Sequence, residues 1–536
     1  MDFYLHMLSP AVMVLGLMWV GAIMHNKTNE KKKKSSLAES SSPPSLSVMK
    51  RHKIRNEFIA RPGARPILSN KPADIGAYRG WLVMAALLLL GFLARQGVKN
   101  MKKHGSFFSV DGGRFLSRIF VSEMIEFATA VLLVYIFSFS AYWVEVAKLR
   151  HPALRSVFQI LAHLAMISLI VMVTAYLLVR SYEVSITFRF AVSAQAFVTY
   201  MKMVSYLGTN EYLKDLGEHH AKPKKTDKDE EDQVAVEEIP FEKIVQALAH
   251  RGIDVFHHLK SVPGDDSPEF KARKVYKELL ELDMYRKNIY PRNVTLKNFF
   301  EFTCLPVLVY EPKYPRTERI DYRNLVEKLI VTMAMIIFAW SLMEQFIIPA
   351  LTKLIIHEKD ASYTTLEAML DLVVPLQVFV VLIFYTVFEC ILGANAEIVR
   401  LADREFYSDW WNSTSFEEFS RKWNKPVHEF LLRHVHIQAQ TWLGLRRQTA
   451  TIVTFIYSIV AHEIILIAMF GIFRPYLGFF SLFQIPLWFV MRSPLFQGKV
   501  LGNIVFWACL TLAWPIMSVL YCREYCLQDE RNCRIY

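Results

Sequence analysis

The chain has 536 residues, 53% of them hydrophobic, and several of its apolar runs approach the ~20 residues that cross a bilayer core. This composition excludes an ordinary soluble protein and predicts a polytopic membrane protein. The formal net charge of +12 is of the kind found in nucleic-acid-binding proteins, but the lysines and arginines fall largely between the apolar runs. There they orient membrane spans and meet anionic lipid or an anionic substrate, so we expect no nucleic acid as a partner.

The N-terminal apolar run covers residues 4–24 and is followed by the basic stretch Lys31–Lys34. A cleavable signal peptide carries its positive charge before its apolar core. We therefore interpret residues 1–25 as an uncleaved membrane anchor whose C-terminal side is cytosolic, with removal of the segment as the alternative. Residues 26–78 are rich in Ser, Pro and Lys, which cannot bury a core, and are predicted to be a disordered cytosolic segment. Residues 79–536 are predicted to form one membrane domain.

Nine further apolar runs follow the anchor. They begin near Trp81, Met124, Val157, Ile186, Leu329, Leu370, Thr449, Tyr476 and Leu501. All ten runs together predict an all-α fold with about nine to ten transmembrane helices, because the run at Trp81 is short and the run at Ile186 contains charged residues. Successive spans cross the membrane in alternating directions, and we take the basic stretch as cytosolic. Counting from there places a charged loop at 208–298 and the stretch 406–428 in the cytosol, and the C-terminus in the lumen. We assign no catalytic role to the charged loop.

The stretch "FYSDWWNSTSFEEFSRKWNKPVH" is polar and aromatic although it lies between two apolar runs. Two overlapping capping-box patterns, Thr414 with Glu417 and Ser415 with Glu418, predict that a helix begins here. Three aromatic side chains share one face of that helix: Phe416, Phe419 and Trp423. We predict an amphipathic helix on the cytosolic membrane surface that ends at Pro426, followed by a second short one.

The apolar run "TATIVTFIYSIVAHEIILIAMFGIF" contains three polar residues, Ser458, His462 and Glu463. With a rise of about 1.5 Å per residue, His462 lies roughly 20 Å along the helix from Thr449, near the middle of the membrane. Polar groups at this depth usually face a cavity or a substrate path, and the alternative is a histidine that hydrogen-bonds a neighbouring helix. A neutral imidazole in a dry site is suited to taking a proton from an alcohol. The sequence contains no nucleotide-binding glycine loop, serine-hydrolase elbow or zinc-protease helix, so we expect no metal.

The motif "FYSDWWN" resembles the F-Y-x-D-W-W-N signature of the sterol and diacylglycerol acyltransferase branch of the membrane-bound O-acyltransferases. The segments "RKWNKPVH" and "SIVAHE" are similar to the Asn and His elements of that family. Within the branch, "CLPVLVYEPKYPRTERIDYRNLVEK" and "WNKPVHEFLLRHVH" look most like fungal sterol O-acyltransferases. The likeness extends well from about Pro291 to the C-terminus, weakly over the spans at 120–207, and not to the first 80 residues.

The resemblance implies a mechanism without a covalent acyl-enzyme. His462 is then the general base that deprotonates the sterol 3-hydroxyl as it attacks the thioester of a fatty acyl-CoA. Asn424 is the second catalytic residue, an amide that orients the thioester or hydrogen-bonds the charge developing on its oxygen. Glu463 is expected to orient His462 or to serve the acceptor side, and Ser458 to line the substrate tunnel. Acyl-CoA is a co-substrate, and no permanently bound cofactor is expected.

The stretch 406–428 is interpreted as the cytosolic mouth through which acyl-CoA enters. Four arginines are candidates for the CoA phosphates: Arg421, Arg433, Arg446 and Arg447. Five residues are candidates for contact with the pantetheine and thioester: Tyr407, Trp410, Asn412, Trp423 and His428. Asp409 is expected to brace a neighbouring basic or backbone group. For each of these residues the alternative is an interfacial anchor or a fold-bracing side chain.

The resemblance also implies an endoplasmic-reticulum membrane protein that takes a sterol of the ergosterol or cholesterol class from the bilayer and assembles as a homodimer or larger homo-oligomer. In this family a small lumenal loop is closed near the C-terminus, which implies a disulfide between Cys526 and Cys533, with Cys522 as an alternative partner. Two rival functions remain open. One is a diacylglycerol O-acyltransferase with the same mechanism, and the other is a transporter or lipid sensor in which His462 relays protons or packs.

Overall fold

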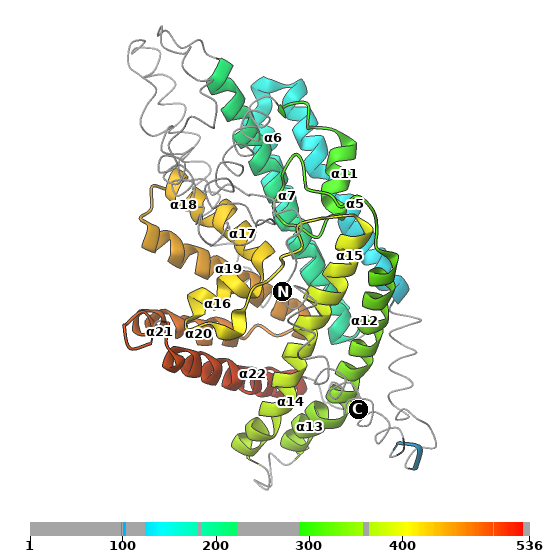
Figure 1. Ribbon diagram of the computed structural model, residues 1–536, viewed down its shortest axis with the longest axis vertical. Coiled ribbons are helices and arrows are strands. Elements are labelled where there is room, and N and C mark those ends of the chain that lie inside the picture. The colour runs from blue at the N-terminus through cyan, green and yellow to red at the C-terminus, as the bar shows by residue number, and fades with distance from the viewer. Residues whose placement is uncertain are drawn as a thin grey trace, which may run out of the picture.

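The structure of the chain is a computed structural model. It describes residues 124–180, 184–221, 289–356, 364–496 and 498–528, together with Val98 and residues 100–102. Helices form the regular structure of these ranges (Figure 1), and the β contact found there is an isolated antiparallel bridge between Arg316 and Leu401. The predicted all-α fold is therefore confirmed for this part of the chain. The predicted anchor at 1–25, the segment at 26–78 and the run at Trp81 lie outside the described residues.

Three long helices pack side by side at the N-terminal end of the described chain: α5 (Met124–Arg150), α6 (Arg155–Val179) and α7 (Ile186–Ala221). The first two contain neither Gly nor Pro, so no helix breaker interrupts their apolar runs. Apolar side chains fill the space between them, among them Met166, Met203 and Tyr206. The third helix continues to Ala221, past the position at which the sequence predicts a loop to begin, and the rest of that loop up to residue 288 lies outside the described residues.

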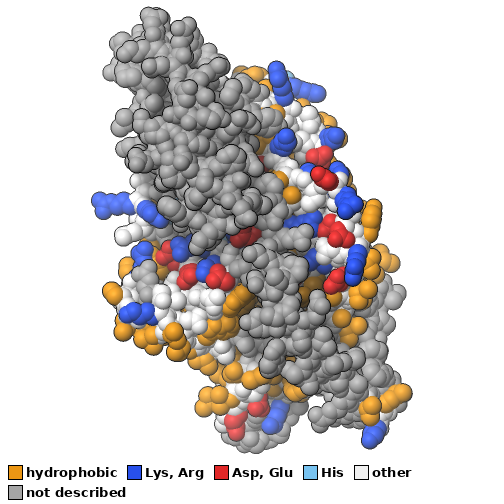
Figure 2. All heavy atoms as spheres, in the orientation of Figure 1, with side chains coloured by type: hydrophobic (Ala, Val, Ile, Leu, Met, Phe, Trp, Pro, Cys, Tyr) orange, Lys and Arg blue, Asp and Glu red, His pale blue; other side chains and the backbone are white. Residues whose placement is uncertain are grey.

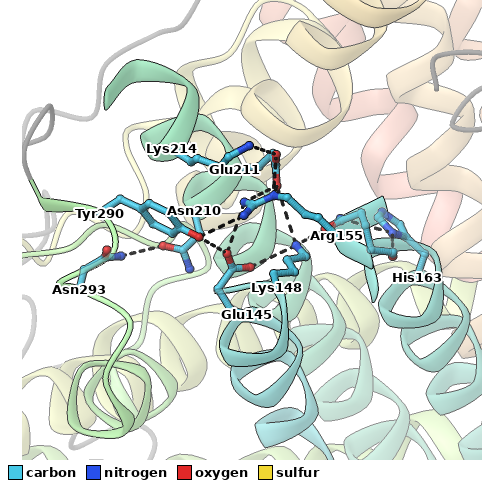
Figure 3. Close-up of polar contacts among 10 residues, drawn as sticks. Glu145, Lys148, Arg155, His163, Asn210, Glu211, Lys214, Tyr290 and Asn293 are labelled. Atoms are coloured by element: carbon cyan, nitrogen blue, oxygen red, sulfur yellow. Dashed lines mark hydrogen bonds and ion pairs between the residues drawn. The ribbon is translucent and has the colours of Figure 1, made fainter. Parts of the chain in front are cut away.

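A cluster of charged side chains joins one end of these three helices (Figure 3). Lys148 and Glu145 are fully buried on α5 and lie 3.1 Å apart, and Arg155 of α6 lies 2.8 Å from Glu211 of α7. The hydroxyl of Tyr290 donates a hydrogen bond of 3.0 Å to Glu145. A buried charge is tolerated only when it is paired, so this cluster specifies how the three helix ends meet the segment that begins at residue 289.

A second group of helices begins with α11 (Leu296–Cys304) and continues with two long helices, each interrupted by one π-helical turn. Their bounds are α12 (Tyr322–Leu342), the turn Met343–Ile347, α13 (Ile348–Ile356), α14 (Thr365–Tyr385), the turn Thr386–Ile391 and α15 (Leu392–Ile398). A reciprocal capping box of Thr364 and Glu367 starts α14. Single π turns inside α-helices are frequent at functional sites, and the turn after α14 carries Glu389, which contacts the motif loop described below.

The C-terminal part contains two long helices, α19 and α22, with short helices before and between them. Their bounds are α16 (Phe416–Trp423), α17 (Lys425–Leu431), the π-helical turn Leu432–His436, α18 (Ile437–Trp442), α19 (Arg447–Phe470), α20 (Tyr476–Leu482), α21 (Gln484–Met491) and α22 (Val500–Gln528). α19 packs against α6 and α7, whereas α22 packs against α14. The two long C-terminal helices thus connect the N-terminal helices to the second group.

Six helices of the described part are long and apolar enough to cross a membrane. They are Met124–Arg150, Pro152–Val179, Tyr322–Ile355, Thr365–Ile398, Arg447–Phe470 and Val500–Cys526. These correspond to six of the predicted runs. The run predicted at Ile186 forms α7, which carries buried Arg189 and Lys202, and the run at Tyr476 forms two short helices, α20 and α21. Neither of these runs forms a helix that is long and apolar enough to cross a membrane by the same criterion. The described residues therefore support a multi-pass membrane protein without establishing nine to ten spans.

The described surface separates charged from apolar areas (Figure 2). On the face shown, acidic and basic side chains lie next to one another over α16 and the start of α19, above a band of hydrophobic side chains over α20 and α21. Exposed phenylalanines on these two helices and between them include Phe479, Phe483 and Phe489. A boundary of this kind is typical of the place where a membrane protein passes from lipid to water.

Candidate functional site

The motif loop, residues 406–413, is fastened to α14 by its tyrosine. Tyr407 is fully buried, and its hydroxyl donates a hydrogen bond to the carboxylate of Glu389 on the π-helical turn. The same carboxylate lies 3.8 Å from the ammonium group of Lys328 on α12. The ring of Tyr407 meets Phe384 edge-on at 4.8 Å. These contacts connect the loop to two membrane-spanning helices and favour the fold-bracing role for Tyr407.

Trp410 is the centre of an aromatic cluster. Its side chain is 3% exposed, and its ring lies 4.7 Å from Trp423, 5.2 Å from Phe384, 5.7 Å from Trp507 and 5.9 Å from Phe419. Aromatic pairs at these distances stabilise a packed core beyond the area that they bury. Trp410 therefore lies inside the protein, and Trp423, which is half-buried, is the more accessible of the two tryptophans that the sequence analysis placed near the pantetheine.

Two polar residues of the motif, Asp409 and Asn412, contact each other and a neighbouring cation. Asp409 lies 3.0 Å from the ammonium group of Lys422, and Asn412 donates a hydrogen bond of 3.4 Å to the other carboxylate oxygen of Asp409. This is the kind of bracing contact predicted for Asp409. Asn412 is exposed at this edge of the loop.

The predicted helix after the motif is present as α16. Ser415 is its N-cap and accepts the Glu418 N–H at 3.2 Å, while the Glu418 carboxylate accepts the N–H of Thr414 at 2.9 Å. Of the two overlapping capping patterns, the one that starts at Ser415 is thus used. The aromatic face of the helix packs on protein, since Phe416 and Phe419 lie 5.7 and 5.3 Å from Phe506 of α22. The apolar face predicted to lie in the membrane surface is largely covered by α22 and the motif loop instead.

One acidic residue of α16 lies near cations from three parts of the chain: α16 itself, the start of α19 and the residue that follows α21. Glu417 lies 2.9 Å from Arg421 and 4.0 Å from Arg492, and it accepts the indole N–H of Trp488 at 2.9 Å. Burial raises the pKa of Glu417, but the Trp488 hydrogen bond and the charges of Arg421, Arg492 and Arg447 outweigh it and hold that pKa below its usual value. Arg421 is 52% exposed, as a phosphate-binding residue must be. Trp488 and Arg492 were missed by the sequence analysis because nothing in their local sequence links them to a helix some 70 residues earlier.

Asn424 separates α16 from α17 and acts as the N-cap of the second helix. Its side-chain oxygen accepts the backbone N–H of Val427 at 3.2 Å, and Pro426 occupies the first turn, where its missing N–H has no cost. Because the oxygen is engaged in capping, the side chain has its amide hydrogens left to donate. This orientation suits the expected role of stabilising negative charge on a substrate oxygen.

His428 and Arg433 follow on the next two turns and differ in environment. Burial lowers the pKa of His428, and the charges of Arg421 and Lys425 lower it further against the opposing effect of Glu429, so this histidine favours the neutral form. The side chain of Arg433 is 3% exposed and lies 2.8 Å from the buried carboxylate of Glu311. Arg433 therefore contributes to a buried ion pair and does not present a surface charge to phosphate, in contrast to the role expected from the sequence.

Arg446 and Arg447 lie at the exposed start of α19. Arg446 is the N-cap residue of that helix, and Arg447 is its first residue. The π-helical turn and α18, which continue the chain from α17, pack against α19. The segment that carries Asn424 is thus continuous with helices that contact the helix of His462, and both arginines lie at the charged end of that helix.

His462 is on α19 and is exposed. Its Nδ1 lies 2.7 Å from the backbone carbonyl oxygen of Ser458. A carbonyl oxygen only accepts, so Nδ1 carries the proton, and the Nε2 lone pair is directed away as an available base. Ser458 contacts His462 through its backbone and not through its hydroxyl.

Glu463 does not have the contact with His462 that the sequence analysis considered. Its carboxylate accepts the backbone N–H of Gly478 at the start of α20 and the hydroxyl of Tyr521 of α22, the latter at 3.4 Å. Neighbouring residues on a helix point about 100° apart, so Glu463 faces α20 and α22 while His462 faces elsewhere. Its observed function is to connect three helices.

The cysteines near the C-terminus agree with one of the two pairings. Cys526 is disulfide-bonded, whereas Cys522 has a free thiol, which excludes the alternative partner. Cys533, the partner implied by the resemblance, lies outside the described residues.

The chain is similar in sequence to known membrane-bound O-acyltransferases. Residues 266–523 match the family model of the membrane-bound O-acyltransferases. The chain is 32% identical over 306 residues to sterol O-acyltransferase 2 of Candida albicans, a region that covers 56% of this chain and 49% of that protein. It is 38% identical over 256 residues to sterol O-acyltransferase 1 of Saccharomyces cerevisiae, which covers 45% of this chain and 42% of that protein. It is also 29% identical over 249 residues to diacylglycerol O-acyltransferase 1 of Dictyostelium discoideum, covering 46% of this chain and 40% of that protein. The chain thus spans about half or less of the length of these relatives.

Proposed function

From the match of residues 266–523 to the membrane-bound O-acyltransferase family model, we propose that the protein belongs to this family and transfers a fatty acyl group from acyl-CoA to the 3-hydroxyl of a sterol. The observation that carries the proposal is the state of His462, whose Nδ1 proton is held by the Ser458 carbonyl so that Nε2 is free to accept a proton. Several similar fungal proteins are named sterol O-acyltransferases, which supports a sterol as the acceptor.

The reaction proceeds in one active site. Nε2 of His462 removes the hydroxyl proton as the sterol oxygen attacks the thioester carbonyl carbon, and the amide of Asn424 donates a hydrogen bond to the carbonyl oxygen as it gains negative charge. When the C–S bond breaks, the imidazolium returns the proton to the departing CoA thiolate. The products are a steryl ester and CoA, and the histidine is restored to its neutral form.

The two substrates arrive from different phases. Acyl-CoA is a water-soluble polyanion with an apolar chain, and we propose that it enters from the cytosol beside Arg421, Arg446 and Arg447, with Asn412, Trp423 and His428 near its pantetheine arm. The sterol enters sideways from the bilayer. We place the protein in the endoplasmic-reticulum membrane with its C-terminus in the lumen, assembled as a homodimer or larger homo-oligomer.

The direct test uses membranes that contain the full chain, labelled oleoyl-CoA, and a sterol and diacylglycerol offered together. His462→Ala is assayed alongside His151→Ala, a matched control in which an exposed histidine at the end of α5 is removed. We expect label in steryl ester with the wild type and the control, and none with His462→Ala at equal protein level. Acyl transfer that survives in His462→Ala contradicts the assignment of the base.

The same assay separates the rival functions. Label in triacylglycerol would identify diacylglycerol as the acceptor and leave the mechanism unchanged. The similarity to the Dictyostelium enzyme supports this possibility. If labelled acyl-CoA is not consumed, the protein is not an acyltransferase, and a transporter or lipid-sensing function replaces it.

A further inference from the structure

The first turns of α22 hold the backbone of the motif loop. The side-chain amide of Asn503 donates two hydrogen bonds, to the carbonyl oxygens of Trp411 at 3.0 Å and Ser413 at 2.9 Å. The indole N–H of Trp507 donates a third, also to the Trp411 carbonyl, at 3.0 Å. Asn503 and Trp507 are four residues apart and therefore share one face of the helix, so this face of α22 is matched to two carbonyl acceptors of the loop, those of Trp411 and Ser413.

The helix approaches the loop closely because Gly502 has no side chain. A Cβ atom at this position would lie 2.9 Å from the Thr414 carbonyl oxygen and 2.3 Å from that of Phe496, and real Cβ atoms do not approach so closely. The turn before the helix contributes as well, since Gly498 has a φ of +70° and donates its N–H to the Thr414 hydroxyl at 3.2 Å. The backbone of α22 thus lies against residues 411–414 at this point.

The three hydrogen bonds bracket one motif residue. Their acceptors, the carbonyls of Trp411 and Ser413, stand on either side of Asn412, whose exposed side chain contacts Asp409. Fixing the two flanking carbonyls restricts the backbone dihedral angles of Asn412 and therefore the direction of its side chain. The amide of Asn503 reaches both flanking carbonyls, whereas Trp507 reaches one of them.

We propose that Asn503 is a positioning residue that orients Asn412 and the adjoining motif loop for acyl-CoA, an inference that rests on the proposed function. It acts through the loop and does not touch the reacting atoms. Removing its two donors loosens the loop while the contacts of α22 with α14, made further along the helix by Val519, remain. The expected consequence is weaker acyl-CoA binding without a change at the sterol or at the base.

The test compares Asn503→Leu with Asn395→Leu in the purified full-length protein. Both substitutions remove an amide of the same size, but Asn395 donates its exposed side-chain hydrogen bond, of 3.4 Å, to the Cys304 carbonyl, which lies outside the motif loop. We measure the Kd of a non-hydrolysable ether analogue of oleoyl-CoA, and the kcat and both KM values for sterol esterification. We expect Asn503→Leu to weaken analogue binding and raise the KM for oleoyl-CoA about tenfold, with the KM for sterol and kcat unchanged, because the Ser413 carbonyl loses the amide donor and the Trp411 carbonyl keeps only the Trp507 indole N–H.

A second variant keeps the test decisive if Asn503→Leu does not fold. Trp507→Phe removes one donor and keeps an aromatic ring in place, so we expect a change in the same direction that is smaller than that of Asn503→Leu. Analogue binding equal to wild type in both folded variants overturns the inference, as does a fall in kcat with unchanged KM for oleoyl-CoA. If the wild type itself does not bind the analogue, the proposed function fails, and the inference fails with it. If the wild type binds the analogue and both variants bind it equally well, the inference about Asn503 fails while the proposed function stands.

Discussion

Nδ1 of His462 lies 2.7 Å from the carbonyl oxygen of Ser458, one helical turn earlier on α19. In the proposed mechanism a backbone carbonyl thus performs the orienting function that a carboxylate has in many histidine-dependent enzymes, because it holds the ring in one tautomer and leaves the Nε2 lone pair available to accept a proton. The neighbouring carboxylate, Glu463, is committed to α20 and α22. This division of roles leads to the first two predictions.

The contact between Ser458 and His462 predicts unequal effects of two substitutions. His462→Ala removes the base and should lower kcat by about 10²- to 10⁴-fold, the usual contribution of general base catalysis. Ser458→Ala keeps the backbone carbonyl and should leave the pH dependence of kcat unchanged. The measurement is kcat against pH for both variants. A shifted pH profile in Ser458→Ala would show that the hydroxyl, and not the carbonyl, sets the state of the histidine.

Glu463 should behave as a structural residue. Glu463→Gln retains an oxygen that accepts the Gly478 N–H, so we expect activity close to that of the wild type. Glu463→Ala leaves this N–H and the Tyr521 hydroxyl without their shared acceptor and should reduce stability by about 1–3 kcal/mol, seen as a lower Tm in detergent. A loss of kcat in Glu463→Gln at unchanged Tm would instead assign this carboxylate to the orientation of His462.

Arg433 and Arg447 should separate stability from substrate binding. Arg433→Leu removes the cation that lies 2.8 Å from the buried carboxylate of Glu311 and should destabilise the protein by about 3–5 kcal/mol. Arg447→Gln should leave Tm unchanged and raise the KM for acyl-CoA roughly tenfold, since a charge-assisted contact with phosphate is lost. The matched control is Arg474→Gln, because Arg474 is also exposed but belongs to a different part of the surface. If Arg474→Gln raises the KM for acyl-CoA as much, the effect of Arg447→Gln comes from the change in net charge and not from a contact with phosphate.

His428 predicts a stability change on the acid side. Its pKa is lowered in the folded protein, mainly by burial, relative to the ordinary value of 6.5, so the unfolded chain binds more protons in the interval between the two values. The stability that neutral His428 contributes is therefore fully present above pH 6.5 and is lost as the pH falls through that interval. His428→Gln should flatten the dependence of Tm on pH between 5 and 7. His436 also has a lowered pKa, so part of the slope will remain, and an unchanged slope in His428→Gln would contradict the prediction.

The features that the sequence by itself determined are local. Apolar runs long enough to cross a bilayer became helices, Ser415 began α16 as its capping pattern predicts, and the position of His462 inside an apolar run identified it as a candidate base. Such features depend on residues within one continuous segment, because hydrogen bonds from residue i to i+4, helical periodicity and the length of an apolar run are properties of that segment alone.

The tertiary structure alone decided which distant residues meet. The sequence predicted that Arg433 binds a phosphate, but helix packing places it in an ion pair with Glu311. Packing also brings the Glu463 carboxylate into hydrogen bonds with Gly478 and Tyr521. The hydrogen bonds of Asn503 to the motif loop join residues about 90 positions apart. An arginine, a glutamate or an asparagine has the same intrinsic preferences whether it binds a ligand or braces a fold. The partner that satisfies its charge or amide is fixed by helix packing, which no local pattern encodes.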